Sequence, residues 1–198
     1  MYNLCSSTNC SSDRNIFPIL EKEYIALDLE TTGFSPVNDR IIEFSAVYYV
    51  NGEDVDRFTT LIDPGRSVSN NASGVNGITG AMLEGAPKEE DVVWEIAEYI
   101  RPAIEGHMFI CAHNARFDIG FLTALFERYG IEADLRYVDT LALSRRYFKG
   151  LKSYTQPAVA DYLDIKRDVE HRAEEDAVVC GTILRRVCEQ YRIVSQEK

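Results

Sequence analysis

The 198-residue sequence lacks any apolar run close to the ~20 residues that a membrane-spanning helix requires. Residues 1–15 are polar and rich in serine, cysteine and asparagine, and they lack the basic and apolar parts of a signal peptide. The sequence shows no repeat, low-complexity linker or second domain. We therefore expect a flexible tail over residues 1–20, a single domain over residues 21–192 and a C-terminal tail over residues 193–198, without a membrane segment.

The cysteines lack the pattern of a disulfide framework or a zinc site, since their number is odd and their spacing irregular. Three of them lie in apolar surroundings and are expected to be core thiols, whereas Cys5 and Cys10 could also form a redox pair. A reducing cytoplasm is the default location for such a chain. The five cysteines are Cys5, Cys10, Cys111, Cys180 and Cys188.

The sequence also lacks an excess of positive charge, because its net charge is -11. This argues against a general nucleic-acid binder, which usually carries a basic face. Residues 140–160 are an exception, with four basic residues and no acid: Arg145, Arg146, Lys149 and Lys152. This stretch is either a solvated helix face or a local patch that contacts phosphates.

The pattern of apolar residues predicts strands followed by alternating strands and helices. Segments 24–30, 41–50 and 55–62 have strand character, and Asn51-Gly52 predicts a hairpin between the second and third. Met108–Ala112 is expected to be a short buried strand. Helical spacing predicts helices over residues 89–104, 115–129, 139–148, 155–163 and 173–191. The expected fold is therefore α/β, with a mixed β-sheet flanked by α-helices.

Two carboxylates share one face of the first predicted strand. Asp28 and Glu30 are two residues apart, so both project from the same side. Paired like charges repel, and a bound divalent cation would relieve that repulsion. Oxygen ligands suit Mg²⁺ or Mn²⁺. The alternative is an edge strand with a solvated acidic face.

Two further acids lie on apolar stripes of predicted helices. Asp118 heads a stripe near a helix N-terminus, and favourable interaction with the helix dipole is the alternative explanation. The polar groups crowded into residues 113–118, just after a buried strand, make that alternative less attractive. Asp176 projects into the buried stripe of the last helix, and a buried charge is costly unless it is paired or binds a metal. His171 precedes that helix and could reach the same place, although a loop histidine is often merely exposed. Together these residues predict a two-metal site for phosphodiester cleavage, with His171 suited to accept a proton from water.

Three motifs carry a resemblance to a known family. They are Asp28-Leu29-Glu30-Thr31-Thr32-Gly33, His113-Asn114-Ala115-Arg116-Phe117-Asp118, and His171-Arg172-Ala173-Glu174-Glu175-Asp176. The chain resembles the DEDDh family of 3′–5′ exonucleases, the DnaQ-like group that includes the exonuclease domain of proofreading epsilon subunits. The five-residue spacing from histidine to aspartate is similar to the histidine branch of that family. The resemblance covers about residues 22–190.

The resemblance implies a ribonuclease-H-like fold and two Mg²⁺ or Mn²⁺ ions. By motif position, Asp28, Glu30, Asp118 and Asp176 would bind the metals, and His171 would be the general base. The implied substrate-binding residues are Thr31, Thr32, Gly33, Ile78, Met82, Leu83, His113, Asn114 and Phe117. For Ile78, Met82 and Leu83, ordinary core packing is an equally good explanation. Gly80-Ala81 departs from the acidic or polar pair often found at this place in the family.

The expected activity is hydrolysis from the 3′ end of single-stranded or frayed DNA, releasing nucleoside 5′-monophosphates, in proofreading or repair. A DNA polymerase is a partner that this activity implies. One alternative is the same chemistry on RNA or short oligonucleotides, because contacts to a 2′-OH are not readable from the sequence. The other is a catalytically silent nucleic-acid-binding module. The presence of all five catalytic residues argues against this alternative. The sequence does not decide between monomer and dimer.

Overall fold

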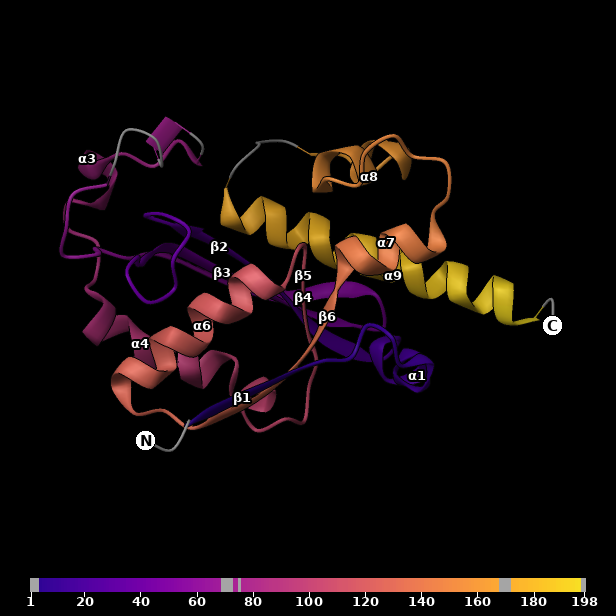
Figure 1. Cartoon of the computed structure of the whole chain (residues 1–198), viewed down its shortest axis with the longest axis horizontal. Coiled ribbons are helices and arrows are strands. Elements are labelled where there is room, and N and C mark those ends of the chain that lie inside the picture. The colour runs from indigo at the N-terminus through magenta and orange to yellow at the C-terminus, as the bar shows by residue number, and fades with distance from the viewer. Residues whose placement is uncertain (1–3, 69–72, 75, 168–171, 197–198) are drawn as a thin grey trace.

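A six-stranded mixed sheet forms the centre of the computed structural model, which describes residues 4–68, 73–74, 76–167 and 172–196 (Figure 1). The strand order across the sheet is β1-β6-β5-β2-β3-β4. β2, β3 and β4 pair antiparallel, and the other neighbours pair parallel. The strands are β1 Cys5–Asn9, β2 Glu23–Thr31, β3 Ile41–Val50, β4 Glu53–Leu61, β5 Ile110–Ala112 and β6 Ala133–Asp139.

The predicted hairpin joins β3 to β4. Asn51 and Gly52 both have positive φ, at 54° and 82°. Two left-handed residues in succession match the twist of the flanking strands, and asparagine and glycine adopt that conformation at the least cost. The expected α/β fold with a mixed sheet and flanking helices is confirmed.

Helices cover both faces of the sheet (Figure 1). Their bounds are α1 Phe17–Leu20, preceded by the short 3₁₀ helix η1 Arg14–Ile16, then α3 Gly80–Leu83, α4 Glu89–Tyr99, α5 Arg101–Ile104, α6 Arg116–Tyr129, α7 Thr140–Tyr147, α8 Gln156–Tyr162 and α9 Ala173–Gln196. The predicted helix over residues 89–104 is thus two helices. Pro102 lies at the start of α5, where proline is tolerated, whereas it disrupts the interior of a longer helix.

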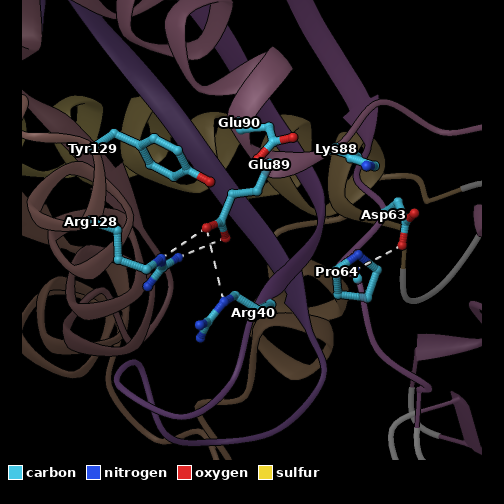
Figure 2. Close-up of a pocket in the computed structure, with 9 residues that line it drawn as sticks. Arg40, Asp63, Pro64, Lys88, Glu89, Glu90, Arg128 and Tyr129 are labelled. Carbon is cyan, nitrogen blue, oxygen red and sulfur yellow. Dashed lines mark hydrogen bonds and ion pairs between the residues drawn. The ribbon is translucent and has the colours of Figure 1, made fainter.

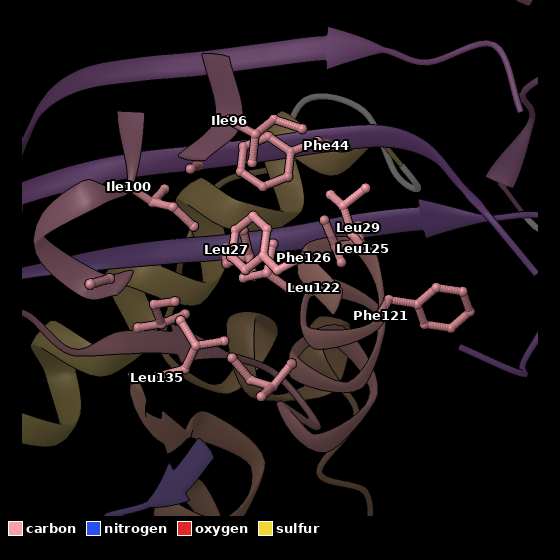
Figure 3. Packing of buried hydrophobic residues seen from close by; sticks show 14 of the residues in the cluster. Leu27, Leu29, Phe44, Ile96, Ile100, Phe121, Leu122, Leu125, Phe126 and Leu135 are labelled. Atoms are coloured by element: carbon pink, nitrogen blue, oxygen red, sulfur yellow. The ribbon is translucent and has the colours of Figure 1, made fainter. Parts of the chain in front are cut away.

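Two apolar cores result, one on each face. Figure 3 shows the first, in which Leu27 and Leu29 of β2 pack among leucine and phenylalanine side chains of α6 and isoleucines of the α4 region. The second core lies between the other face and α1, α7, α8 and α9. Tyr24 and Ala26 of β2 belong to this second core. Because strand residues alternate, Asp28 and Glu30 project on the same side as Tyr24 and Ala26, toward α9.

Gly181 allows α9 to lie close to the sheet. A Cβ atom at this position would collide with the ring of Tyr49 on β3. The absence of a side chain therefore permits the close approach of α9 to β3. The Tyr24 hydroxyl also donates to the carbonyl oxygen of Gly181 at 2.8 Å. These contacts fix the helix over the strand that carries the paired acids.

The expectation of a flexible tail over residues 1–20 is wrong for the described part of that segment. β1 pairs in parallel with β6, from Cys5 opposite Ala133 to Asn9 opposite Tyr137. Ile16, Phe17 and Leu20 are buried in the second core. The C-terminal tail is also shorter than expected, since α9 continues to Gln196. Backbone pairing and three apolar anchors order the N-terminal segment in spite of its polar composition.

All five cysteines are free thiols in buried positions, which confirms the core assignment for Cys111, Cys180 and Cys188. Cys5 and Cys10 belong to different cores on opposite faces of the sheet. Within the described ranges, no helix has the length and apolar character needed to cross a membrane.

Candidate active site

Strand β2 presents two carboxylates on the face that α9 covers. Asp28 and Glu30 alternate with Leu27 and Leu29, which are buried in the first core. The leucines anchor the strand, so the acids between them must project to the other side. Both acidic side chains are half-buried.

The first turn of α9 brings a third carboxylate to this pair. One carboxylate oxygen from each of Asp28, Glu30 and Asp176 lies within 4.8 Å of the other two. The Gln156 amide nitrogen, at the start of α8, donates to Asp176 Oδ1 at 2.9 Å and to the Asp176 carbonyl oxygen at 3.0 Å. Three predicted site residues, far apart in the sequence, therefore meet in one place.

The fourth predicted carboxylate, Asp118, adjoins this cluster from the first turn of α6. Its side chain is buried, with 4% exposure. After burial itself, the charge of Asp118 is the largest cause of the raised pKa of Asp28. Backbone hydrogen bonds at Asp118 and Leu29 hold the Asp118 carboxyl group beside β2.

The crowded carboxyl groups bind protons more tightly than isolated ones. Burial, followed by the charges of Asp118, Asp176 and Glu30, raises the pKa of Asp28 well above its usual range. Burial, followed by the charge of Asp176, raises the pKa of Glu30 to about 7. Burial also raises the pKa of Asp118 to about 8. At neutral pH the cluster therefore holds negative charge only at a cost in stability.

This donor set fits a divalent cation. All four ligand candidates offer oxygen atoms, and three converge within 4.8 Å. Hard cations with oxygen ligands are bound by such groups, and a cation would offset the repulsion that raises these pKa values. The residues that would hold metal are Asp28, Glu30, Asp118 and Asp176.

The metal-free protein is expected to lose stability as the pH rises. Glu30 and Asp118 have folded-state pKa values of about 7 and about 8, above the ordinary values of 4.5 and 3.8. The folded state thus binds these protons more tightly than the unfolded state, and the stability present below about pH 4 is lost as pH rises through 7 to 8. Thermal unfolding in EDTA at pH 5.5 and pH 8.5 measures the effect. A melting temperature that stays constant or rises across this interval would contradict it.

An ion pair between the buried Glu43 and the partly exposed Arg172 fixes the start of α9 against β3. Glu43 is 1% exposed and stands opposite Glu30 in the pairing of β2 with β3. Its carboxylate accepts hydrogen bonds from Arg172 Nη2 at 2.6 Å and from the Ala173 backbone N–H at 3.1 Å. The Arg172 carbonyl oxygen in turn accepts from the Asp176 N–H at 3.0 Å. Glu43 therefore holds the turn that carries Asp176.

Sequence reasoning missed Glu43, Gln156 and Asn76. An acid within the apolar run Ile41–Val47 is a signal that could have singled out Glu43. Asn76 is buried and its hydrogen bond to Glu30 lowers the pKa of that carboxyl group. Nothing in the local sequence distinguishes Gln156 or Asn76, because their roles depend on which residues the fold places beside them.

The turn after β2 uses its hydroxyl groups internally. Thr31 Oγ1 donates to the Gly33 carbonyl oxygen at 2.6 Å, and Thr32 Oγ1 accepts from the Arg40 N–H at 3.0 Å. A Cβ at Gly33 would lie 2.6 Å from a carboxylate oxygen of Asp39, so a larger residue there would displace the Asp39 side chain, which accepts a hydrogen bond from the Ser35 N–H at 2.9 Å. Thr31, Thr32 and Gly33 therefore shape the loop next to the carboxylates, and their contacts with substrate remain a prediction.

The segment between the first two motifs divides into buried and exposed residues. Ile78 and Leu83 are buried with Ile42 in a small third core, which favours the packing explanation for these two side chains. Met82 is 39% exposed and remains available to a ligand.

His113 has both ring nitrogens engaged. Nδ1 is 3.0 Å from Thr140 Oγ1, and Nε2 is 2.9 Å from the Tyr154 carbonyl oxygen, to which it donates. Burial lowers the pKa of His113. The Asn114 N–H donates to Asp139 Oδ1 at 3.0 Å, with Asn114 at a φ of 65°. These two residues join the β5–α6 turn, which leads to Asp118, to the start of α7.

Phe117 belongs to a short row of aromatic rings. It packs against Phe121, and its ring centroid is 6.5 Å from that of Phe34. Phe34 follows Gly33 and is 88% exposed. The predicted general base, His171, lies outside the described residues.

A separate hollow of about 530 Å³ lies at the other end of α6 (Figure 2). Glu89 accepts hydrogen bonds there from Arg128 Nε at 2.9 Å and from Arg128 Nη2 at 2.7 Å. Arg40 Nε lies 4.0 Å from Glu89 Oε1. The pairing joins α4, α6 and the β2–β3 loop. None of the four predicted carboxylates lines this hollow.

A mixed sheet between helices, with three converging carboxylates and Asp118 beside them, fits a hydrolase of the metal-dependent nuclease class. The RNase T exonuclease model matches residues 25–184, and the chain belongs to this exonuclease family. The predicted DEDDh, DnaQ-like affiliation and the assignment as an enzyme are confirmed.

The chain is similar to one region of much longer proteins. It is 39% identical over 171 residues to the PolC-type DNA polymerase III of Halalkalibacterium halodurans, covering 86% of this chain and 12% of that protein. It is 36% identical over 176 residues to the PolC-type DNA polymerase III of Thermotoga maritima, with 88% and 12% covered. The chain thus spans about an eighth of the length of these curated relatives.

Solved structures share the fold. Exonuclease X in complex with 5′-overhanging duplex DNA superposes with a TM-score of 0.66 at 26% identity, covering 84% of this chain and 90% of that chain. E. coli Exonuclease I in complex with a dT13 oligonucleotide gives a TM-score of 0.76 at 17% identity, covering 89% and 43%. The second likeness is one of fold alone.

Proposed function

We propose that the chain is a 3′–5′ exonuclease that removes nucleoside 5′-monophosphates from single-stranded or frayed DNA ends. The observation that carries this proposal is the convergence of Asp28, Glu30 and Asp176 within 4.8 Å, with Asp118 beside them. The DNA substrate is supported by the similarity to PolC-type DNA polymerases and to Exonuclease X, which was solved with DNA. By the same similarity, the chain would correct or trim ends for a DNA polymerase.

The four carboxylates would hold two Mg²⁺ or Mn²⁺ ions. Such ions supply charge neutralisation at the phosphate and a lowered pKa for the attacking water. Asp118 and Glu30 would release their protons when the cations bind, because the repulsion that raises their pKa values is then offset. His171 would accept the proton of the attacking water. Glu43 and Gln156 would keep Asp176 in place.

Matched 5′-labelled single-stranded DNA, duplex DNA and RNA, each with Mg²⁺, Mn²⁺ or EDTA, test the proposal. We expect a ladder of shortened DNA in the presence of metal, with deoxynucleoside 5′-monophosphates as products. Immediate release of the 5′ label would contradict the direction. Faster decay of RNA would contradict the DNA assignment, and no hydrolysis of any substrate with either metal would contradict the nuclease.

Phe34 is expected to stack on a base of the substrate strand. Its ring is 88% exposed on the loop that follows β2, although large aromatic side chains are usually buried. Its centroid lies 6.5 Å from that of Phe117, the residue that precedes Asp118. Stacking of a base on an aromatic ring contributes about 1–3 kcal/mol. The change Phe34→Ala should therefore raise KM for single-stranded DNA about 5- to 150-fold, with a smaller change in kcat.

Val37→Ala is the matched control for Phe34, because Val37 is 79% exposed on the same loop and has no aromatic ring. Steady-state kinetics on one oligonucleotide compares both variants with the parent. Equal KM values for Phe34→Ala and the parent would exclude the stacking role.

A further inference from the structure

The last turn of α7 and the connection from α7 to α8 carry exposed positive charge in a protein with a net charge of -11. Arg145, Lys149 and Lys152 are exposed. The Lys149 ammonium group donates to the Arg145 carbonyl oxygen at 2.8 Å, which keeps the two residues together. Among the described residues, none of the three forms an ion pair with an acid. Their charges are thus available to an external anion.

This connection also borders the carboxylate site. The Tyr154 carbonyl oxygen accepts from His113, which follows β5 and begins the second motif. Gln156, two residues further, donates to the side chain of Asp176. The segment that contains Lys149 and Lys152 therefore runs directly into two contacts at the edge of the site. Figure 1 shows α8 alongside the N-terminal half of α9, where Asp176 lies.

The basic stretch and the acidic site affect a polyanionic strand in opposite ways. The four carboxylates, without metal, and the acidic body repel a polyanion. A strand whose terminal nucleotide lies at the site must cross the surrounding surface, and phosphates are most favourably placed where cations lack partners. Residues 140–160 supply such a surface without any acid.

We infer that Arg145, Lys149 and Lys152 contact backbone phosphates of the substrate strand upstream of the terminal nucleotide. This inference rests on the proposed function for the position of the strand end. It assigns the three residues to recognition of the phosphate backbone without reading of bases, because ammonium and guanidinium groups at phosphates carry no sequence information. The length of the bound strand, not its sequence, should then determine affinity at this surface.

The salt dependence of binding tests the inference. Fluorescein-labelled dT12 and dT3 are titrated with the Asp28→Asn protein, which prevents degradation, and with the same protein carrying Arg145→Ala, Lys149→Ala and Lys152→Ala. Each phosphate contact with single-stranded DNA contributes about 0.7 to the slope of log K against log salt. The triple change should lower the slope for dT12 by about 2, and thereby weaken binding up to about a hundredfold at 0.1 M salt relative to 1 M.

A control with the same loss of charge is Lys22→Ala, Arg101→Ala and Arg192→Ala. Lys22 precedes β2 and Arg192 lies late in α9, each toward the end of its element opposite to Asp28 or Asp176. Arg101 begins α5, which carries none of the four carboxylates. The control should retain the parent slope. An unchanged slope for the Arg145, Lys149 and Lys152 variant, or equal losses in both triple variants, would overturn the inference.

Failure of the inference is distinguishable from failure of the proposed function. Hydrolysis of thymidine 5′-(p-nitrophenyl phosphate), which has no upstream phosphate, reports on the carboxylate site by itself. If the parent cleaves this ester with Mn²⁺ but the slopes agree, only the phosphate contacts are excluded. If the parent cleaves neither the ester nor DNA, the nuclease proposal fails, and the slopes still decide whether this surface binds a strand.

Discussion

Replacing Asp28 with asparagine is expected to lower kcat/KM about a thousandfold or more. Asp28 is the carboxylate whose neighbours include all three other acids, as the causes of its raised pKa show. Metal ions stabilise the transition state of phosphoryl displacement by several kcal/mol, and each 1.36 kcal/mol is about a factor of ten in rate. The same change removes an acid whose pKa is raised well above its usual range by burial and by its neighbours, and with it the cost of ionising or protonating that group in the folded state. In EDTA at pH 8, Asp28→Asn should therefore melt at a higher temperature than the parent protein.

The paired outcome separates a catalytic role from damage to the fold. Glu23→Gln is the matched control, because Glu23 is exposed at the other end of β2. This substitution also replaces one carboxylate with an amide. It should leave both activity and melting temperature near those of the parent. Loss of activity in Asp28→Asn together with a lower melting temperature would indicate a structural role. Retained metal-dependent hydrolysis would refute the metal-ligand assignment.

Local pattern was sufficient to find the acids but not to bring them together. Alternation along residues 24–30 placed Asp28 and Glu30 on one face, and helical spacing placed Asp118 on a buried stripe. That Asp176 would meet them depends on the path of the chain through six strands, which short-range periodicity does not encode. The joint occurrence of acids on buried faces predicted a shared site, and the resemblance to a family supported it, but neither showed which contacts hold the acids together.

Two strands were missed for different reasons. β1 has only Cys5 buried, so no apolar alternation marks it, and its pairing with β6 rests on backbone hydrogen bonds between distant segments. β6 does alternate, with Ala133, Leu135 and Tyr137 buried, but its parallel partner on the outer side, β1, has the composition of a polar tail. A strand whose partner is unrecognised is easily read as a connection between helices.

The ion pair between Glu43 and Arg172 shows the same limit at the site itself. An isolated acid in an apolar strand indicates that a partner must exist, because an unpaired buried charge is costly. The partner cannot be identified from the sequence, since Arg172 lies in a different part of the chain and is no more conspicuous than other arginines. Only the fold shows that the pair anchors the helix turn bearing Asp176.

Replacing Arg172 with methionine is expected to destabilise the protein by about 2–4 kcal/mol. Removing one partner of a buried pair leaves the other charge uncompensated, at a cost of about 3–5 kcal/mol, and the partial exposure of Arg172 reduces that cost. Glu43 would keep only the Ala173 N–H among its described partners. For a chain of this size the melting temperature should fall by roughly 5–15 °C.

The same substitution should raise the Mn²⁺ concentration needed for half-maximal activity about 10-fold or more, because groups that orient metal ligands affect metal affinity by about 10–100-fold. A merely structural pair would lower stability without this shift, so metal titration at a temperature where the variant is folded separates the two roles.

Combining Arg172→Met with Glu43→Gln removes the uncompensated charge while keeping an oxygen for the Ala173 N–H. The double variant should therefore regain stability relative to Arg172→Met but not metal affinity, since the arginine that fixes the turn of Asp176 is still absent. If the double variant were less stable than Arg172→Met alone, the charge of Glu43 would be tolerated without Arg172, and the expected compensation would be wrong.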